Sequence, residues 1–405
     1  MIKTETIIPE FKQSPPGKIP SDWDLKKLGT LVEITSGESP SLYNLKNIGK
    51  YPYLKVEDLN NCEKYQTESR EYSNDEKGLV PKNSIIFPKR GAAILNNKVR
   101  INSIIVQMDS NLMAIYPKSN QLYYEYLYYR IIFEQLYRIA DTSTIPQINN
   151  KHIIPYSFPL PPLPEQKAIT YILGLMDEAI NKNNSLIAKK ELQKKWLMQN
   201  LLTGKKRLMG FIGEWKKLNI KDVSKEVSIR NKSDNQLTVL SCTKYDGLVP
   251  SLEYFGRKIF SDDVSTYKVV PKNHFAYATN HIEEGSIGYQ ETLKEALISP
   301  MYTVFKTDSS INDTFFYKLL KSHKLVYQYQ NRMEGSIDRR GGLRWDAFSI
   351  IKVQIPSYEE QSAIAQVLQV ADKEIQLLKT KLEKLREQKK WLMQQLLTGK
   401  KRILV

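Results

Sequence analysis

Cysteine and histidine are scarce in this sequence. Among 405 residues there are two cysteines, Cys62 and Cys242, and four histidines, with no CxxC or HExxH pattern. Two cysteines cannot build a disulfide framework, so we expect a protein of the reducing cytoplasm, and we predict no metal site. Long apolar runs are absent as well: no stretch of about eighteen apolar residues occurs, and the N-terminal segment lacks the charged-then-apolar order of a secretion signal. Neither a membrane span nor export is therefore predicted.

Acidic residues are in the minority. The chain has 60 Lys and Arg against 44 Asp and Glu, a formal net charge of +16. A charge of this sign favours a polyanionic partner, either nucleic acid or an anionic membrane surface, although an ordinary basic protein would have the same composition. The length of the chain favours two domains with connectors over a single core.

What the sequence does contain is an internal repeat. Residues 165–207 align without a gap with residues 360–402, and the match is densest at the end, where QKKWLMQNLLTGKKR and QKKWLMQQLLTGKKR differ at one position. The tetrapeptide VPKN at 80–83 recurs at 270–273. The chain is therefore organised as variable block, helix-like repeat, variable block, helix-like repeat.

Both repeats have the pattern of a coiled-coil helix. Apolar residues return at alternating steps of three and four, and Gly204 and Gly399 are placed to end the two helices. Because a block precedes each helix, antiparallel pairing would put one block at each end with pseudo-twofold symmetry. A plain helical hairpin scaffold would have the same seam. The residues predicted to pair the helices are Ile169, Leu173, Ile180, Leu197 and Leu201 in the first and Ile364, Leu368, Ile375, Leu378, Leu382, Leu385, Leu392 and Leu396 in the second.

The helix length suggests a spacer between two DNA-reading modules. About 38 helical residues at 1.5 Å each make a rod of about 57 Å. This corresponds to about 17 base pairs at about 3.4 Å each, which is room for two short half-sites and an unread gap. Two similar basic blocks on a rigid spacer therefore match a bipartite DNA site.

The motif PLPPLPEQ before the first helix, WLMQNLLTGKKR at its end and the second copy of that helix resemble the specificity (S) subunit of type I restriction-modification systems. The resemblance covers the whole chain. It implies an α+β fold in which two globular α/β target recognition domains are separated by two long helices that form an antiparallel coiled coil. The implied parts are target recognition domain 1 (1–158), spacer helix 1 (159–207), target recognition domain 2 (208–353) and spacer helix 2 (354–405). The start of the second helix departs from the pattern, with PSYEEQ for PPLPEQ, and residues 1–17 have no assigned role.

The resemblance also implies a function and partners. Each target recognition domain would read one half of a split asymmetric sequence in double-stranded DNA, while the helices set the gap and dock two methyltransferase (M) subunits. The M subunits would modify adenine with S-adenosylmethionine, and two restriction (R) subunits would add cleavage that needs ATP and Mg. No cofactor and no catalytic residue is implied for this chain itself.

A search for catalytic motifs also predicts a non-enzymatic chain. The [ND]PP[YF] motif of adenine methyltransferases does not occur, and the GKKR segments lack the earlier glycine and the Ser or Thr of a P-loop. The ExK triplets lie within the predicted helices rather than on strands. The acidic pairs 262–263 and 283–284 are interpreted as solvated loop residues, or as acceptors for a cytosine amine, rather than as metal ligands.

Candidate DNA-contacting residues are polar and basic side chains that gather in segments without a helical or strand period. Each of them could also be a solvated loop residue. The aromatic segment 123–133 is interpreted as a core helix rather than a base-stacking platform. The candidates are Lys89, Arg90, Thr144, Gln147, Asn149, Asn150 and Lys151 in the first block, and Lys244, Tyr245, Thr279, Asn280, His281, Arg339, Arg340 and Arg344 in the second.

Two other classes of function stay open at this point. The chain could be a coiled-coil adaptor that joins protein partners, or the target-recognition part of a fused methyltransferase–nuclease. The segments 141–151 and 336–346, which align at the offset of the helices, have diverged while the helices have not. This difference favours two readers of different half-sites.

Overall fold

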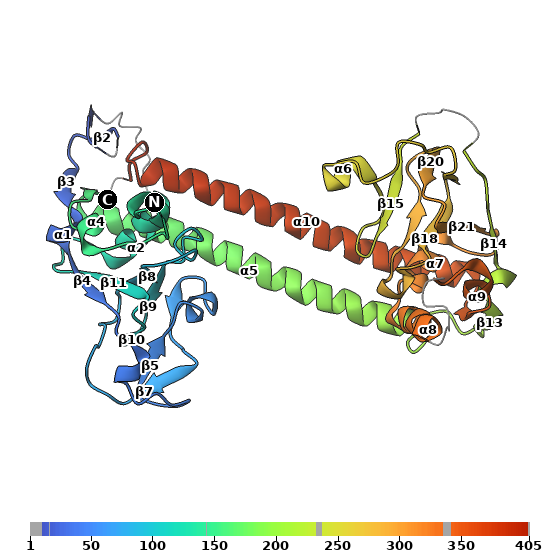
Figure 1. Cartoon of the computed structure of the whole chain (residues 1–405), viewed down its shortest axis with the longest axis horizontal. Helices are drawn as coiled ribbons and strands as arrows, with labels where there is room; N and C mark the ends of the chain where they lie inside the picture. The colour runs from blue at the N-terminus through green and yellow to red at the C-terminus, as the bar shows by residue number, and fades with distance from the viewer. Residues whose placement is uncertain (1–9, 16, 143, 232–236, 335–341, 404–405) are drawn as a thin grey trace. The chain divides into compact units, whose positions relative to one another are not determined.

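The chain folds into two compact units. The computed structural model describes residues 10–15, 17–142, 144–231, 237–334 and 342–403. Unit 1 consists of residues 1–184 and 381–405, and unit 2 of residues 185–380. Two 39-residue helices, α5 (Leu163–Leu201) and α10 (Tyr358–Leu396), each begin in one unit and end in the other (Figure 1). The predicted fold class, two α+β blocks with two long helices, is confirmed.

Unit 1 is built on a five-stranded sheet with the order β4-β11-β8-β9-β6. β11 (Leu112–Pro117) is antiparallel to both β4 (Val32–Ser36) and β8 (Ile85–Pro88), and β9 (Arg100–Asn102) joins β8 to β6 (Tyr65–Gln66). Every residue of β8 is buried, as expected for an apolar strand covered on both faces. The other elements of unit 1 are β1 (Phe11–Lys12), β2 (Ile19–Pro20), β3 (Asp24–Lys27), α1 (Leu28–Leu31), η1 (Pro40–Leu42), β5 (Tyr51–Leu54), η2 (Asp58–Asn60), β7 (Glu71–Ser73), β10 (Gln107–Met108), α2 (Tyr124–Glu134), α3 (Leu136–Ile139), α4 (Asn150–Ile153) and β12 (Ser157–Leu160).

The aromatic segment 123–133 forms a core helix of unit 1, as predicted. α2 buries Tyr126 and Tyr129 completely, and the ring of Tyr126 packs edge-on against Phe158 with 6.0 Å between ring centroids. Arg130 is the one charged residue that α2 buries, and its Nη1 donates a hydrogen bond to the carbonyl oxygen of Leu397 (2.9 Å). The same core contains side chains from the end of α10, so that end is part of unit 1.

Unit 2 has a four-stranded antiparallel sheet with the order β14-β21-β18-β19. Phe275 of β18 stacks on Phe305 of β21 at 5.0 Å, and this aromatic core also holds Leu201 and Leu202 from the end of α5. The elements of unit 2 besides the long helices are β13 (Lys216–Asn219), η3 (Ile220–Asp222), β14 (Ser224–Glu226), β15 (Leu240–Thr243), β16 (Gly247–Pro250), α6 (Ser251–Phe255), β17 (Lys268–Pro271), β18 (His274–Ala278), η4 (Ile282–Glu284), β19 (Ile287–Gln290), β20 (Glu295–Ile298), β21 (Tyr302–Thr307), α7 (Asp313–Leu320), α8 (His323–Glu334), α9 (Trp345–Ser349) and β22 (Lys352–Ile355).

Inside each unit the two long helices run antiparallel and are joined by equivalent ion pairs. Lys389 pairs with Asp177 in unit 1, and Lys194 with Asp372 in unit 2, at positions that correspond in the repeat. All thirteen residues predicted to form the apolar seam are buried or half-buried. Several of them lie in the domain cores, Ile169, Leu173 and Leu396 in unit 1 and Leu201, Ile364 and Leu368 in unit 2, so their pairing between the helices stays a prediction. In the described parts of the chain, no helix combines the length and apolar character needed to cross a membrane.

Candidate nucleic-acid interface

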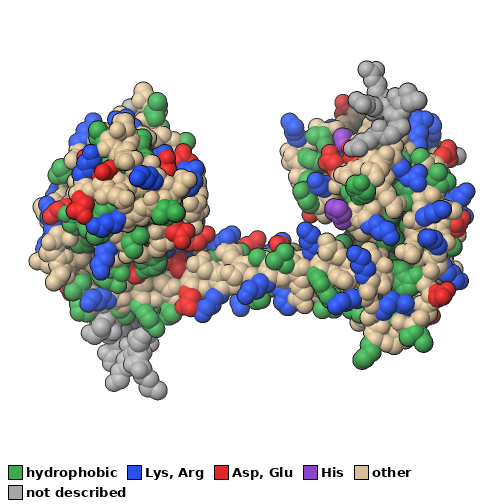
Figure 2. Space-filling model, turned by 90° about the horizontal axis from the view of Figure 1, so that it is seen from below, with side chains coloured by type: hydrophobic (Ala, Val, Ile, Leu, Met, Phe, Trp, Pro, Cys, Tyr) green, Lys and Arg blue, Asp and Glu red, His purple; other side chains and the backbone are tan. Residues whose placement is uncertain are grey.

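Charge alone does not locate an interface on the face of the molecule that Figure 2 shows. On the face drawn in Figure 2, Lys and Arg side chains are spread over the surface of each unit, with acidic side chains between them. The site therefore has to be found from the contacts that bring the predicted DNA-contacting residues together.

In unit 1, two of the predicted segments meet at the end of β8. The residues that follow this strand pair with residues 146–148: Ile148 N–H donates to Lys89 O (2.9 Å), and Gly91 N–H donates to Pro146 O (2.9 Å). Arg90 stands opposite Gln147 in the same bridge. We call Lys89–Gly91 together with Pro146–Lys151 the strand-end site of unit 1.

The side chains of this site are presented at the surface by its backbone contacts. Arg90 is exposed, while the pKa of the half-buried Lys89 is lowered, first by burial and then by the neighbouring charge of Arg90. Asn149 precedes the single turn of α4, and its N–H donates to His152 Nδ1 (3.0 Å). A one-turn helix is too short to show a period, which explains why the sequence indicated an irregular segment. Thr144, Asn149, Asn150 and Lys151 are all exposed.

Unit 2 has an equivalent site at the end of β18. Thr279, Asn280 and His281 follow this strand, and Leu343 N–H donates to Thr279 O (2.9 Å). Alignment of the two VPKN tetrapeptides places Thr279 at the position of Lys89, and alignment of the helices places Leu343 at the position of Ile148. The same hydrogen bond is therefore made in both units. We call Thr279–His281 together with Gly342–Asp346 the strand-end site of unit 2.

A cleft of about 390 Å³ opens at this second site, and Thr279, Asn280 and Arg344 are among its lining residues. Gly342 has a φ of +62°, and a Cβ there would lie 2.6 Å from Asn280 Oδ1, so glycine permits the close approach of the two segments. Arg344 is exposed at the start of α9 and forms no ion pair with any described residue. Its neighbour Trp345 packs on Phe305 with 5.5 Å between ring centroids, which fixes the start of α9.

Among the described residues, Lys244 and Tyr245 are not part of these sites. Lys244 and Tyr245 lie in the turn between β15 and β16, where Lys321 Nζ donates to Lys244 O (2.8 Å). Neither of them lines the cleft at the end of β18. Arg339 and Arg340 lie outside the residues that the structure describes.

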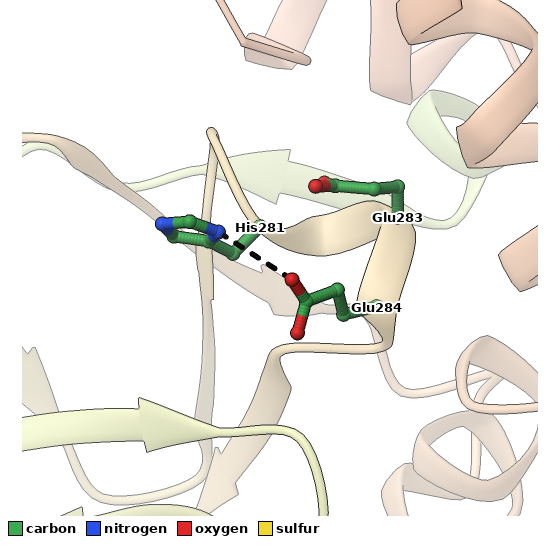
Figure 3. A group of neighbouring side chains, drawn as sticks. All are labelled: His281, Glu283 and Glu284. Atoms are coloured by element: carbon green, nitrogen blue, oxygen red, sulfur yellow. Dashed lines mark ion pairs between the residues drawn. The ribbon is translucent and has the colours of Figure 1, made fainter.

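His281, Glu283 and Glu284 gather around η4, with ligand atoms within 4.8 Å of one another (Figure 3). His281 Nδ1 lies 3.9 Å from Glu284 Oε1, and both side chains are exposed. A solvated histidine–carboxylate pair accounts for this contact without a metal ion. The cluster adds negative charge next to the strand-end site of unit 2.

The start of each long helix is fixed to its unit by a repeated Glu-Gln pair. Gln166 Oε1 accepts from Tyr123 N–H (2.8 Å) while its Nε2 donates to Pro161 O (2.8 Å); Gln361 makes the equivalent bonds with Asn312 N–H (2.8 Å) and Pro356 O (3.1 Å). The side-chain amides of the two glutamines thus form hydrogen bonds with buried backbone groups at the junction between helix and domain.

The glutamates of the same pairs hold the arginine that follows the other helix. Arg402 Nε donates to Glu165 Oε1 (2.7 Å) in unit 1, and Arg207 pairs with Glu360 through two bonds in unit 2. These bonds raise the pKa of both guanidinium groups. The sequence showed that the EQ and GKKR motifs recur at one offset, but it did not indicate that they touch each other.

Comparisons with known proteins agree on one family. The model of the "Type I restriction modification DNA specificity domain" matches residues 20–192 and again residues 212–387. The MjaVIII specificity subunit of a type I restriction enzyme from Methanocaldococcus jannaschii is 26% identical, over 97% of this chain and 96% of the relative. The putative MjaX specificity subunit from the same organism is 24% identical over 97% of both chains.

Solved structures show the same fold. The S subunit of a type I restriction-modification system from M. genitalium aligns with a TM-score of 0.55 at 17% identity, covering 96% of this chain and 99% of the other. A chain from a study of complex assembly in the type I system aligns with a TM-score of 0.59 at 14% identity, covering 95% and 100%. Because the family model matches most of the sequence in two copies, this chain belongs to the type I restriction-modification specificity subunits and carries two target recognition domains.

Proposed function

We propose that each strand-end site reads the bases of one half of a bipartite DNA sequence. The observation that carries this proposal is the equivalent hydrogen bond in the two units, from Ile148 N–H to Lys89 O and from Leu343 N–H to Thr279 O. The same backbone arrangement thus occurs in both units, and each time it carries side chains that can form hydrogen bonds with base edges. Arginine can donate two bonds to guanine O6 and N7, and asparagine or glutamine can bond both N6 and N7 of adenine.

The side chains on this common scaffold differ, as two different half-sites require. Arg90 in unit 1 corresponds to Asn280 in unit 2, and Asn149 corresponds to Arg344. The contacts that fix the long helices, by contrast, are the same in both units. A constant framework with exchanged reading residues supports an asymmetric recognition sequence.

We further propose that the complete complex contains two methyltransferase subunits and, where present, two restriction subunits. The long helices offer the same surface twice: Trp196 and Trp391 are each 47% exposed, and Lys206 and Lys401 stand over their rings at 4.9 and 4.7 Å. A repeated surface suits two copies of one partner. S-adenosylmethionine, ATP and Mg are expected on these partners, and this chain acts in the cytoplasm without catalytic residues of its own.

Mapping of methylated adenines in cells that produce the chain with its methyltransferase subunit tests the proposal. We expect methylation at one bipartite sequence with two specified halves and an unspecified gap. Methylation at a single short contiguous sequence would contradict two reading sites. A complex that assembles with proteins but shows no affinity for DNA would instead support the adaptor hypothesis.

A further inference from the structure

Unit 2 has a second cleft, separate from its strand-end site. It has a volume of about 1560 Å³ and is lined by the end of α5, the middle of α10, the turn between β15 and β16 and the start of α8. It shares no lining residue with the cleft at the end of β18. We propose that this lysine cleft binds the phosphodiester backbone of DNA independently of sequence, an inference that rests on the proposed DNA-reading function.

The charge of the lining favours phosphate. Six lysines and three acidic residues line the cleft, and each acid is already engaged. Asp372 pairs with Lys194, Glu191 with Lys379 (2.8 Å), and Asp246 accepts from the hydroxyl of Tyr254 (2.8 Å).

The remaining lysines of the cleft are free to bind an anion. All four are exposed, and none forms an ion pair with any residue that the structure describes. An ammonium group acts as a compact point charge that suits phosphate oxygens without requiring a particular base. These lysines are Lys195, Lys205, Lys324 and Lys373.

An exposed tyrosine stands at the edge of the same cleft. Tyr245 is 81% exposed, and Lys244 Nζ lies 5.5 Å from the centre of its ring. Tyrosine hydroxyls and lysines are common phosphate contacts in protein–DNA interfaces. Both residues were predicted to touch DNA, and their position supports contact with the backbone rather than with bases.

The cleft is not repeated in the sequence of unit 1, although the helices are nearly identical. Lys195 and Lys205 correspond to Lys390 and Lys400. The counterparts of two further lining lysines, however, are not basic: Lys373 corresponds to Glu178, and Lys379 to Asn184. A protein partner bound twice in the same way would need the same charges in both units. The asymmetry therefore favours DNA over a duplicated acidic protein surface.

Salt dependence of binding tests the inference with the assembled complex. The variant K195Q/K205Q/K324Q/K373Q is titrated onto two fluorescent duplexes, one with the methylated sequence and one with that sequence scrambled. The slope of log K against log salt is negative, and each lost phosphate contact reduces its magnitude by about 0.9. We therefore expect the magnitude of the slope to fall by roughly 3 to 4 on both duplexes. Between about 50 and 200 mM salt, the affinity of the variant should therefore fall roughly 100-fold less than that of the wild type.

Matched pairs of substitutions provide the control. K195Q/K205Q removes two lysines of the cleft, whereas K390Q/K400Q removes the two corresponding lysines of unit 1, which are also exposed. The first pair should reduce the magnitude of the salt slope by about 2, and the second pair should reduce it by less. Equal effects of the two pairs would show that diffuse charge, not the cleft, attracts DNA, and would overturn the inference.

Other outcomes are equally decisive. An unchanged salt slope in the quadruple variant, or a loss confined to the duplex with the methylated sequence, would overturn the proposal. A variant that binds DNA like the wild type but loses a partner subunit in gel filtration would assign the cleft to an acidic protein surface. If the wild-type complex binds neither duplex, the proposed function fails, and this inference fails with it.

Discussion

Arg344 is exposed at the rim of the unit 2 cleft, while the next side chain, Trp345, is packed against Phe305. Replacement of Arg344 by alanine removes a guanidinium able to donate two bonds to one guanine, without disturbing the packed ring beside it. We expect R344A to reduce discrimination at one base pair of one half-site by about 1–3 kcal/mol. Initial methylation rates of the assembled complex, on duplexes changed at one base pair at a time, measure this effect.

Arg344→Lys is the control for charge. Lysine keeps the positive charge but lacks the planar guanidinium group that donates two parallel hydrogen bonds. R344K should therefore retain nonspecific affinity for DNA and still lose discrimination between base pairs. A uniform loss of binding on every sequence would identify Arg344 as a phosphate contact. Changed preference in the half-site read by unit 1 would contradict the assignment of Arg344 to one reader.

Arg402 closes a buried network in unit 1. Glu165 is 4% exposed and accepts from Arg402 and from Trp23 Nε1 (3.1 Å). The alanine variant R402A would leave this carboxylate buried without its charged partner, and we expect unit 1 to lose about 3 kcal/mol of stability. Urea unfolding, with hydrogen exchange measured in unit 1, detects the loss. The exposed Lys400 supplies the control, because K400A should change stability by less than about 0.5 kcal/mol.

The same network makes that stability difference depend on pH. A side-chain hydrogen bond from Arg402 lowers the pKa of Asp22. A carboxyl group with a lowered pKa in the folded state stabilises the fold above its ordinary pKa, and this contribution is lost as the pH falls through the lowered value. We therefore expect the stability gap between wild type and R402A to be constant near neutrality and to narrow in acid. A gap that widens on acidification would contradict this role of Asp22.

At the scale of elements, two glycines test how closely the segments of a strand-end site must approach. Gly342 and Gly91 both have positive φ, +62° and +79°, but only Gly342 is crowded, since nothing lies within 4 Å of a Cβ placed on Gly91. Each alanine replacement strains the backbone by about 1–2 kcal/mol. G342A must also displace Asn280, so we expect it to weaken reading of the unit 2 half-site, whereas G91A should affect stability alone.

Binding of both variants to duplexes altered in one half-site separates strain from crowding. Equal loss of discrimination in G91A and G342A would show that backbone strain is sufficient. If both variants discriminate between half-site sequences as well as the wild type does, the strand-end sites do not read the bases.

The long helices could be predicted from the sequence because their signal is local and occurs twice: heptad steps followed by a glycine with positive φ at 204 and 399. The strand-end sites could be predicted only in pieces. Arg90 and Gln147 were both candidates, but their bridge depends on which strands become neighbours, and that is decided by packing of the whole unit. Tyr245 was predicted to contact DNA, but its place away from the strand-end site of unit 2 could not be predicted, because the position of a turn residue does not follow from the local sequence pattern.

At the scale of the whole molecule, each unit is completed by the end of the helix that begins in the other. Leu396 and Leu397, from the end of α10, lie in the core of unit 1, and Leu201 and Leu202, from the end of α5, lie in the core of unit 2. Neither unit is therefore encoded by one continuous stretch of sequence. The reading residues can diverge while these repeated contacts hold each domain on the same framework.

A matched insertion into both helices tests whether they set the unread gap. Four residues added between 184 and 185 of α5, and four between 380 and 381 of α10, fall at the boundary of the two units and leave the contacts inside each unit unchanged. A helix rises about 1.5 Å per residue, so each helix lengthens by about 6 Å. At about 3.4 Å per base pair, the unspecified gap in the methylated sequence should grow by about two base pairs, with both half-sites unchanged. Methylation mapping measures the gap directly, and a gap of the original length in an active variant would refute the role of the helices as a ruler.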